Sequence, residues 1–479
     1  MPRRVFAAVD IGASGGRVMA GVVESGTVSL QPVHRFANGV VEADGHLRWP
    51  VHALFDEVVT GLSELASEFP EVESIGIDTW GVDYALLDDD GQLVDQPIAY
   101  RDDRTRAAID VVHGIVEAAD LYEINGQQFL PFNTVYQLVA DQRSGRLDGA
   151  AHVVLLPDLL ACWLTGELRT EATNASTTGL LDARSGQWSN ELLARLGLPS
   201  GLVLPLQQPG EVRGRVQEQL RARLGLPAST VVTTVGSHDT ASAVVAVPAV
   251  DRHFAYVSSG TWSLVGLELD EPIITAASRA ANFTNEGGVD RRTRFLRNTC
   301  GLWLLQESMR AWSEAGHPQD LTSLLAAAAE LPAGGPLIDV DDPAFIPPGQ
   351  MPARIAAAAE AGGAIPPTTP PAVVRCIIDS LAASYATTIR RAAELADTRV
   401  DVVHIVGGGS QNRLLCQLTA DRSGRAVAAG PVEATAFGNV LIQARACGAV
   451  PASLDAIRVE LARVVDVTRY EPIMPRAEV

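Results

Sequence analysis

The chain has 479 residues, of which 47% are hydrophobic and 20% charged, the balance of an ordinary globular protein of two or three domains. Its 57 acidic residues outnumber 37 basic ones, and the formal net charge of −20 argues against a nucleic-acid surface, which needs a basic stripe. The five cysteines are scattered without a Cys-x-x-Cys pair, which excludes a zinc site and a disulfide framework and favours buried thiols.

No apolar run approaches the length of a membrane span, and the N-terminal Met-Pro-Arg-Arg leads directly into a strand without a secretion signal. We therefore expect a cytoplasmic protein whose partners include neither nucleic acid nor a membrane. The sequence indicates no oligomeric state.

The first segment predicts a buried strand over residues 4–10, a small-residue turn over 11–17, and two further strands over 18–23 and 27–36. Strand–glycine turn–strand differs from the dinucleotide pattern, and the chain has no Gly-Lys-Ser/Thr of a Walker loop. Such a turn can offer N–H groups to phosphate oxygens, although for the turn taken alone a plain hairpin is the better interpretation. Asp10 ends the first strand, where it could hold Mg²⁺ directly or through water.

Residues 51–69 predict an amphipathic helix, and residues 72–77 a buried strand that runs into Asp-Thr-Trp-Gly-Val-Asp-Tyr. Trp80 beside the flexible Gly81 suits a sugar site, where an apolar ring face stacks and hydroxyls need polar partners. The alternative is that Trp80 belongs to the core. A further helix is predicted over residues 105–119, and the first half alternates strands and helices as in an α/β lobe.

At the middle of the chain, an apolar strand over residues 231–235 precedes Gly-Ser-His-Asp-Thr-Ala-Ser-Ala, which opens a helix. Ser237 is placed to cap this helix, with Asp239 in or beside its first turn. The helix dipole keeps such a carboxylate ionised, so Asp239 could accept the proton of a hydroxyl that attacks a γ-phosphoryl group. The alternative is that Asp239 only caps the helix.

The second half repeats the opening plan, with strands over residues 254–258 and 263–269 around a Ser-Gly-Thr-Trp turn. Two related halves with two phosphate-directed turns would match the actin-like ATPases, although hairpins are common enough for coincidence. Residues 297–307 are predicted to enter a helix, and residues 373–396 to form a long one. A strand over 402–406 ends in three glycines before a helix over 413–423, a junction where backbone can approach the adenosine part of a nucleotide.

Taken together, these segments resemble the FGGY carbohydrate kinases over nearly the whole chain. The resemblance is carried by motifs at residues 10–19, 76–84, 129–134, 237–243, 257–264, 404–412 and 430–434. It implies an α/β fold of two actin-like (ribonuclease H-like) lobes, residues 1–247 binding sugar and phosphate and residues 248–479 binding nucleotide, with an interlobe active-site cleft. It also implies ATP-dependent, Mg²⁺-assisted phosphorylation of a small ketose, L-rhamnulose, on its 1-hydroxyl group.

Carried over by position, the resemblance makes Asp239 the catalytic base and Gly81 and His238 sugar contacts, beside Trp80. The residues that it assigns to ATP are Ala13, Ser14, Gly15, Gly16, Arg17, Thr261, Asn298, Gln306 and Gly408. One departure is Gly15, where the family pattern implies serine; the glycine removes a possible hydroxyl donor to phosphate but keeps the turn small. Two alternatives stay open: a kinase for another ketose such as L-fuculose, and a non-catalytic actin-like sugar sensor.

Overall fold

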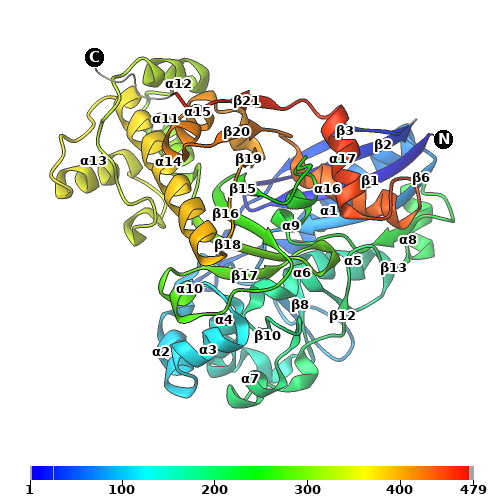
Figure 1. Ribbon diagram of the computed structural model, residues 1–479. Coiled ribbons are helices and arrows are strands. Elements are labelled where there is room, and N and C mark those ends of the chain that lie inside the picture. The colour runs from blue at the N-terminus through cyan, green and yellow to red at the C-terminus, as the bar shows by residue number, and fades with distance from the viewer. Residues whose placement is uncertain (1–2, 25, 474–479) are drawn as a thin grey trace. The chain divides into compact units, whose positions relative to one another are not determined.

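The structure, a computed structural model, describes residues 3–24 and 26–473 of the chain. The chain divides into two compact units, each assembled from separate segments. Unit 1 consists of Met1–Val250, Glu268–Phe295 and Ala434–Val464, and unit 2 of Asp251–Leu267, Leu296–Glu433 and Val465–Val479. The chain is traced by colour in Figure 1.

Unit 1 is built on a six-stranded sheet with the order β13-β14-β6-β1-β2-β3. The strands β1, β2 and β3 form an antiparallel meander, whereas β6 runs parallel to β1 and β14 parallel to β6. The bounds are β1 Arg4–Gly12, β2 Gly15–Glu24, β3 Thr27–Ala37, β6 Val72–Thr79, β13 Val212–Arg215 and β14 Val231–Thr233. The predicted opening strands are confirmed, but β2 begins at Gly15, so only Ala13 and Ser14 form the turn.

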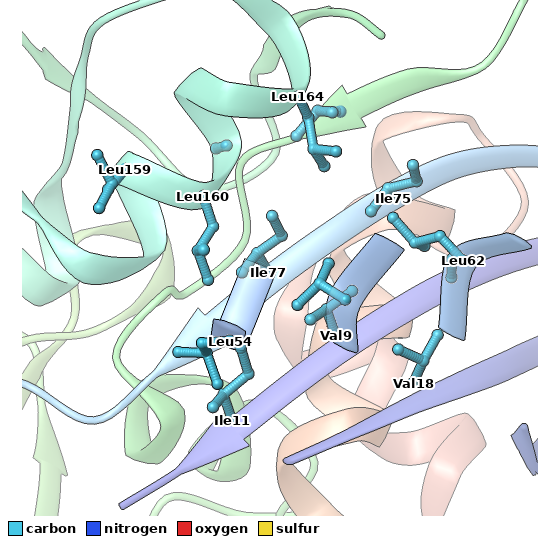
Figure 2. Packing of buried hydrophobic residues seen from close by; sticks show 14 of the residues in the cluster. Val9, Ile11, Val18, Leu54, Leu62, Ile75, Ile77, Leu159, Leu160 and Leu164 are labelled. Atoms are coloured by element: carbon cyan, nitrogen blue, oxygen red, sulfur yellow. The ribbon is translucent and has the colours of Figure 1, made fainter. Parts of the chain in front are cut away.

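Alternate residues of β1 face opposite sides of this sheet, as the strand pleat requires. Val9 and Ile11 pack with α1 (Val51–Glu68) and α5 (Leu156–Thr165) in the cluster shown in Figure 2. Phe6 and Ala8 pack instead with α16 (Ala434–Ala446). Helices therefore cover both faces, which explains why β1 reads as an uninterrupted apolar run. Asp10 continues the even-numbered series and faces α16.

The rest of unit 1 consists of further helices and short strands. They include β7 Tyr84–Leu87, α2 Arg106–Ile115, α3 Ala118–Asn125, α4 Thr134–Ser144, β8 His152–Leu155, β9 Thr170–Glu171, α6 Ala172–Ala175, α7 Asn190–Arg195, α8 Glu218–Leu224, α9 Asp239–Val245 and α17 Leu454–Val464. The helix predicted over residues 105–119 is wrong in extent, because α2 ends at Ile115 and Val116 turns to an extended conformation before α3.

The second sheet has the order β17-β18-β16-β15-β19-β20-β21. Its strands are β15 Phe254–Ser259, β16 Trp262–Leu269, β17 Thr284–Gly287, β18 Thr293–Cys300, β19 Val402–Val406, β20 Ala426–Ala429 and β21 Thr468–Tyr470. The hairpin β15–β16 is antiparallel, β19 runs parallel to β15, and β20 parallel to β19. The order β18-β16-β15-β19-β20 repeats the order β3-β2-β1-β6-β14, so the predicted repeat of one plan is confirmed.

Unit 2 carries the helices α11 Trp303–Glu314, α12 Leu321–Ala329, α13 Met351–Ala361, α14 Pro370–Leu395 and α15 Arg413–Ser423. Residues 297–307 enter a helix as predicted, since α11 begins at Trp303, but Arg297, Asn298 and Thr299 still belong to β18. The expectation that no segment reaches the length of a membrane span is also corrected, since α14 is long and apolar enough. However, 78% of its most apolar window is buried inside the protein, as in the core helix of a globular fold.

Candidate active site

Asp239 is the first residue of α9, so its predicted place in the first turn is confirmed. Its side chain is 31% exposed, and Thr240 Oγ1 donates a hydrogen bond to its Oδ1 at 3.1 Å. The predicted cap is wrong: His238 occupies the N-cap position without a side-chain cap, and the Ser237 hydroxyl donates to Glu171 instead. Asp239 is therefore a partly open carboxylate on a short helix whose preceding residue is fixed by another part of unit 1.

The ring of His238 lies between two acidic side chains. Its Nε2 is 3.5 Å from Asp239 Oδ1, and its Nδ1 is 3.3 Å from Glu286 Oε2. The buried Arg294 also reaches Nδ1, at 3.1 Å, and pairs with Glu286 at 3.0 Å. An arginine can only donate, so the Arg294 contact suits a ring hydrogen on Nε2, whereas the Glu286 carboxylate can only accept and suits one on Nδ1.

A second pair of carboxylates lies where β1 and β6 end. Asp10 and Asp78 are register partners, and Arg17 binds Asp10 Oδ2 through Nε at 3.0 Å and Nη2 at 2.7 Å. Asp78 is fully buried; its Oδ2 accepts from Asn439 Nδ2 at 2.6 Å, whereas its Oδ1 has no hydrogen-bond partner among the described residues. Burial raises the pKa of Asp78 well above its usual value, and the charges of Asp10 and Asp239 raise it further.

These carboxylates fit a divalent cation. The charges of Asp10 and Asp239 act on Asp78, and among the causes of its pKa shift the positive charge of Arg17 opposes them. Within the described part of the chain, Asp78 Oδ1 has no hydrogen-bond partner. A hydrated Mg²⁺ takes oxygen ligands and removes this repulsion, so the donor set at Asp10 and Asp78 suits the predicted ion.

The predicted phosphate turn is the hairpin between β1 and β2. Gly12 and Gly15 are register partners, and Ser14 at the tip is exposed. A Cβ on Gly16 would lie 2.3 Å from the Phe36 ring, which explains a glycine there. A Cβ on Gly15 would lie 3.2 Å from the Phe36 carbonyl oxygen, so a side chain there is tight but not excluded. The turn is held by Asn38, whose Nδ2 donates to the Gly12 carbonyl at 2.9 Å.

Trp80 and Gly81 follow the end of β6, beside the loop that carries His238. The Thr79 N–H donates to the Ser237 carbonyl at 2.9 Å and joins the two segments. Trp80 itself is only 7% exposed and packs against Trp49 with ring centroids 4.4 Å apart, so it lies in the core. Both indole N–H groups donate to Asp83 Oδ2. The half-buried backbone of Gly81, with Thr177 beside it, is the more accessible part.

The residues predicted to contact nucleotide lie in unit 2. Thr261, at the β15–β16 turn, donates from Oγ1 to Gln306 Oε1 at 3.3 Å. Asn298 is half-buried on β18. Gly408 is exposed, and a Cβ there would meet nothing within 4 Å, whereas one on Gly409 would lie 2.0 Å from Ser259 Oγ. The structure thus brings Thr261 and Gln306 together. It also packs the three glycines at residues 407–409 against Ser259 at the end of β15.

Sequence reasoning gave no role to several polar residues that surround the predicted site. Glu171, Glu286 and Arg294 are buried, and each contacts Ser237 or His238 across a long stretch of sequence. The sequence does give a sign for Glu171, which begins a run rich in Thr, Ser and Asn. If this run is buried, its polar side chains need hydrogen-bond partners, and the carboxylate can accept from them. No local pattern distinguishes Glu286 or Arg294.

The comparisons with known proteins agree over nearly the whole chain. Residues 5–246 match the N-terminal domain, and residues 255–447 the C-terminal domain, of the FGGY family of carbohydrate kinases. A rhamnulokinase from Enterococcus faecalis is 40% identical over 99% of this chain and 98% of its own length. A rhamnulokinase from Klebsiella pneumoniae (strain 342) is 44% identical over 92% and 90% of the two chains.

Solved structures share the fold at low sequence identity. A gluconate kinase from Lactobacillus acidophilus superposes with a TM-score of 0.80 at 16% identity, over 98% of this chain and 94% of that one. Plasmodium falciparum glycerol kinase with ADP gives a TM-score of 0.76 at 15% identity over the same shares. The likeness confirms the predicted α/β fold of two actin-like units.

Proposed function

Because the chain belongs to the FGGY family of carbohydrate kinases and is 40% identical over 99% of its length to a rhamnulokinase, we propose that it phosphorylates L-rhamnulose on its 1-hydroxyl group with ATP. The observation that supports the chemistry is the placement of Asp239 at the start of α9, partly exposed and next to the His238 ring. The product would enter the breakdown of L-rhamnose.

In this proposal Asp239 is the general base. A primary hydroxyl becomes a good nucleophile only as it loses its proton, so a carboxylate within hydrogen-bond reach lowers the barrier to phosphoryl transfer. When its Nε2 carries the ring hydrogen, His238 can donate toward Asp239 or toward a sugar oxygen. Arg294 and Glu286 lie 3.1 and 3.3 Å from Nδ1 and hold the ring in place.

The sugar site consists of His238 and the backbone of Gly81, with Trp80 as the support beneath it. Because Trp80 lies in the core with its N–H bound to Asp83, it fixes the loop rather than offering an open ring face. The half-buried backbone of Gly81 and the ring of His238, whose side chain is 9% exposed, then give hydroxyls the polar partners that they require.

ATP is the co-substrate, and Mg²⁺ is the metal that we propose. Asp10, with Asp78 behind it, would hold the hydrated ion, which supplies positive charge for the phosphate oxygens when bound. Residues 13–17 would hold phosphate. Thr261, Asn298, Gln306 and Gly408 would contact the nucleotide, so that residues 1–247 bind sugar and phosphate and residues 248–479 bind nucleotide.

The partners in this proposal are small molecules, and the protein works in the cytoplasm. All five cysteines are free thiols, three of them buried, which fits a reducing compartment.

A coupled assay of ADP release over a panel of ketoses tests the proposal. We expect the highest kcat/KM with L-rhamnulose; no rate with it and a strong rate with L-fuculose would overturn the substrate. Asp239→Asn should lower kcat by about 10²–10⁴-fold with ATP binding retained. The same change at the exposed Asp251, whose side chain is 60% accessible, is the matched control and should leave kcat unchanged. ATP binding without turnover of any ketose would favour the sugar sensor.

A further inference from the structure

Glu171 is a fully buried carboxylate that no step of the proposed chemistry uses. It ends β9 and caps α6, and five hydrogen bonds converge on its two oxygens. Oε1 accepts from the Thr173 N–H at 2.6 Å; Oε2 accepts from Thr173 Oγ1 at 2.6 Å and from the Asn174 N–H at 2.9 Å. The other two come from Ser237, through its N–H at 3.0 Å and its hydroxyl at 2.8 Å.

The donors match an ionised carboxylate. Three of them are backbone N–H groups, which cannot accept a hydrogen bond from a protonated acid. Burial raises the pKa of Glu171, and the bonds from Thr173, Asn174 and Ser237 oppose that rise. A buried acid with this many donors does not need to pair with a cation to remain charged.

Glu171 fixes one side of the Ser237 peptide, and two other residues fix the opposite side. The Ser237 carbonyl accepts from the Thr79 N–H at 2.9 Å and from Asn174 Nδ2 at 3.3 Å. Every polar atom of Ser237 is thus bonded inside unit 1. Because His238 and Asp239 follow directly in the chain, their backbone positions depend on these contacts.

Glu171 is itself held in place by a second buried pair. Its N–H donates to both oxygens of Asp158, at 3.2 and 3.1 Å. Asp158 accepts from Arg213 Nη2 at 2.6 Å. Arg213 lies on β13, which pairs with β14, the strand that leads to the Asp239 loop. The contacts therefore form a closed frame around the loop and leave Glu171 little freedom to move.

We infer that Glu171 is a positioning residue that sets the place of Asp239 and His238 through Ser237, an inference that rests on the proposed role of Asp239. It touches no reacting atom. A displacement of about 1 Å in a reacting group can cost on the order of 100-fold in rate, so the frame acts on kcat rather than on nucleotide binding.

The test is a double-mutant cycle on kcat. Glu171→Gln keeps the size of the side chain but places an NH₂ group where a carboxylate oxygen accepted hydrogen bonds. We expect kcat to fall about 30-fold, while KM for ATP stays within about 2-fold of the wild-type value. Ser237→Ala removes only the hydroxyl bond and should cost about 3-fold. If Glu171 acts through Ser237, the double variant should lose about as much as Glu171→Gln alone, not the product of the two losses.

A matched control separates positioning from stability. Thr230 directly precedes β14, is fully buried, and donates from Oγ1 to the Val72 carbonyl of β6 at 2.9 Å. Thr230→Val loses a buried hydrogen bond without change of shape, so it should lower the Tm and leave kcat as it is. A fall in kcat for this variant equal to that for Glu171→Gln would overturn the inference.

Failure of the positioning role can be distinguished from failure of the proposed base. If Glu171→Gln keeps kcat within about 3-fold while Asp239→Asn is inactive, the positioning role fails and the proposed base stands. If Asp239→Asn turns over normally, the proposed base itself fails. Should Glu171→Gln not fold, Ser237→Ala and Asn174→Ala decide, since each removes one bond to Ser237: a fall in kcat with each supports the inference, and unchanged kcat with both overturns it.

Discussion

Gly438 of α16 meets the backbone of Ser242 of α9 so closely that a Cβ on Gly438 would lie 1.8 Å from the Ser242 carbonyl oxygen. The two helices can approach this far only because position 438 has no side chain. We expect Gly438→Ala to force them apart and to lower the free energy of unfolding by about 3 kcal/mol or more, measured in urea. Since α9 begins at Asp239, kcat should fall as well.

Gly114 in α2 is the matched control for this change. A Cβ there would meet nothing within 4 Å. Gly114→Ala should therefore raise the free energy of unfolding by about 0.5 kcal/mol, because alanine favours the helix, and should leave kcat unchanged. A Gly438→Ala protein as stable as the wild type would contradict the close approach of α16 and α9.

Asp83 should make stability depend on pH. Burial raises its pKa to about 6, against 3.8 for an ordinary aspartate, although the N–H groups of Trp80 and Trp49 oppose this shift. Between about pH 4 and pH 6, Asp83 therefore keeps its proton in the native state, whereas the same carboxyl group is ionised in the unfolded chain. The stability that this provides is fully present below about pH 4 and is lost as the pH rises through about 6.

We therefore expect the wild type to lose about 2–3 kcal/mol more than Asp83→Asn between pH 4 and pH 7, measured by urea unfolding. Asp89→Asn, at an exposed hairpin position, is the control and should follow the wild type at each pH. Parallel curves for wild type and Asp83→Asn would show that Asp83 does not carry this proton.

Asp141 joins two arginines under a cavity of about 540 Å³. It is fully buried and accepts from Tyr84 Oη at 2.7 Å, Arg104 Nε at 3.1 Å and Arg146 Nη1 at 2.8 Å. Asp141→Asn removes the carboxylate that pairs with the buried Arg104, whereas Arg146 keeps Asp95, so the free energy of unfolding should fall by about 3–5 kcal/mol. The control is Asp44→Asn on the same cavity: its carboxylate is 88% exposed and 3.9 Å from Arg48, and no measurable change is expected.

Much of the fold could be predicted where the local pattern of apolar residues determines the secondary structure. The helix expected over residues 413–423 is α15 with the same bounds, and that over 51–69 is α1, because their apolar residues keep a helical period. The strand β18 was missed because its end, Arg297, Asn298 and Thr299, is polar and was included in the segment that enters a helix. Their extended conformation comes from the sheet, not from local propensity.

In the candidate site, too, some residues could be predicted from local sequence and others could not. Asp239 and His238 stand out because an acid and a histidine follow a buried strand. Glu171 and Arg294 do not, since their contacts cross 66 and 56 residues of sequence to Ser237 and His238. Contacts of this length depend on which strands pair. A single sequence could therefore identify the reacting groups but not the buried charges that hold them in place.

Gly15 offers a test of the phosphate turn, because the family pattern has serine there. Gly15→Ser and Gly15→Ala introduce the same Cβ, 3.2 Å from the Phe36 carbonyl oxygen, so they share any steric cost. They differ only in a hydroxyl that can donate to a phosphate oxygen, a bond that contributes about 0.5–1.5 kcal/mol. If residues 13–17 hold phosphate, KM for ATP should be about 3-fold lower for Gly15→Ser than for Gly15→Ala, at similar Tm. Equal KM values at equal stability would place the phosphate elsewhere.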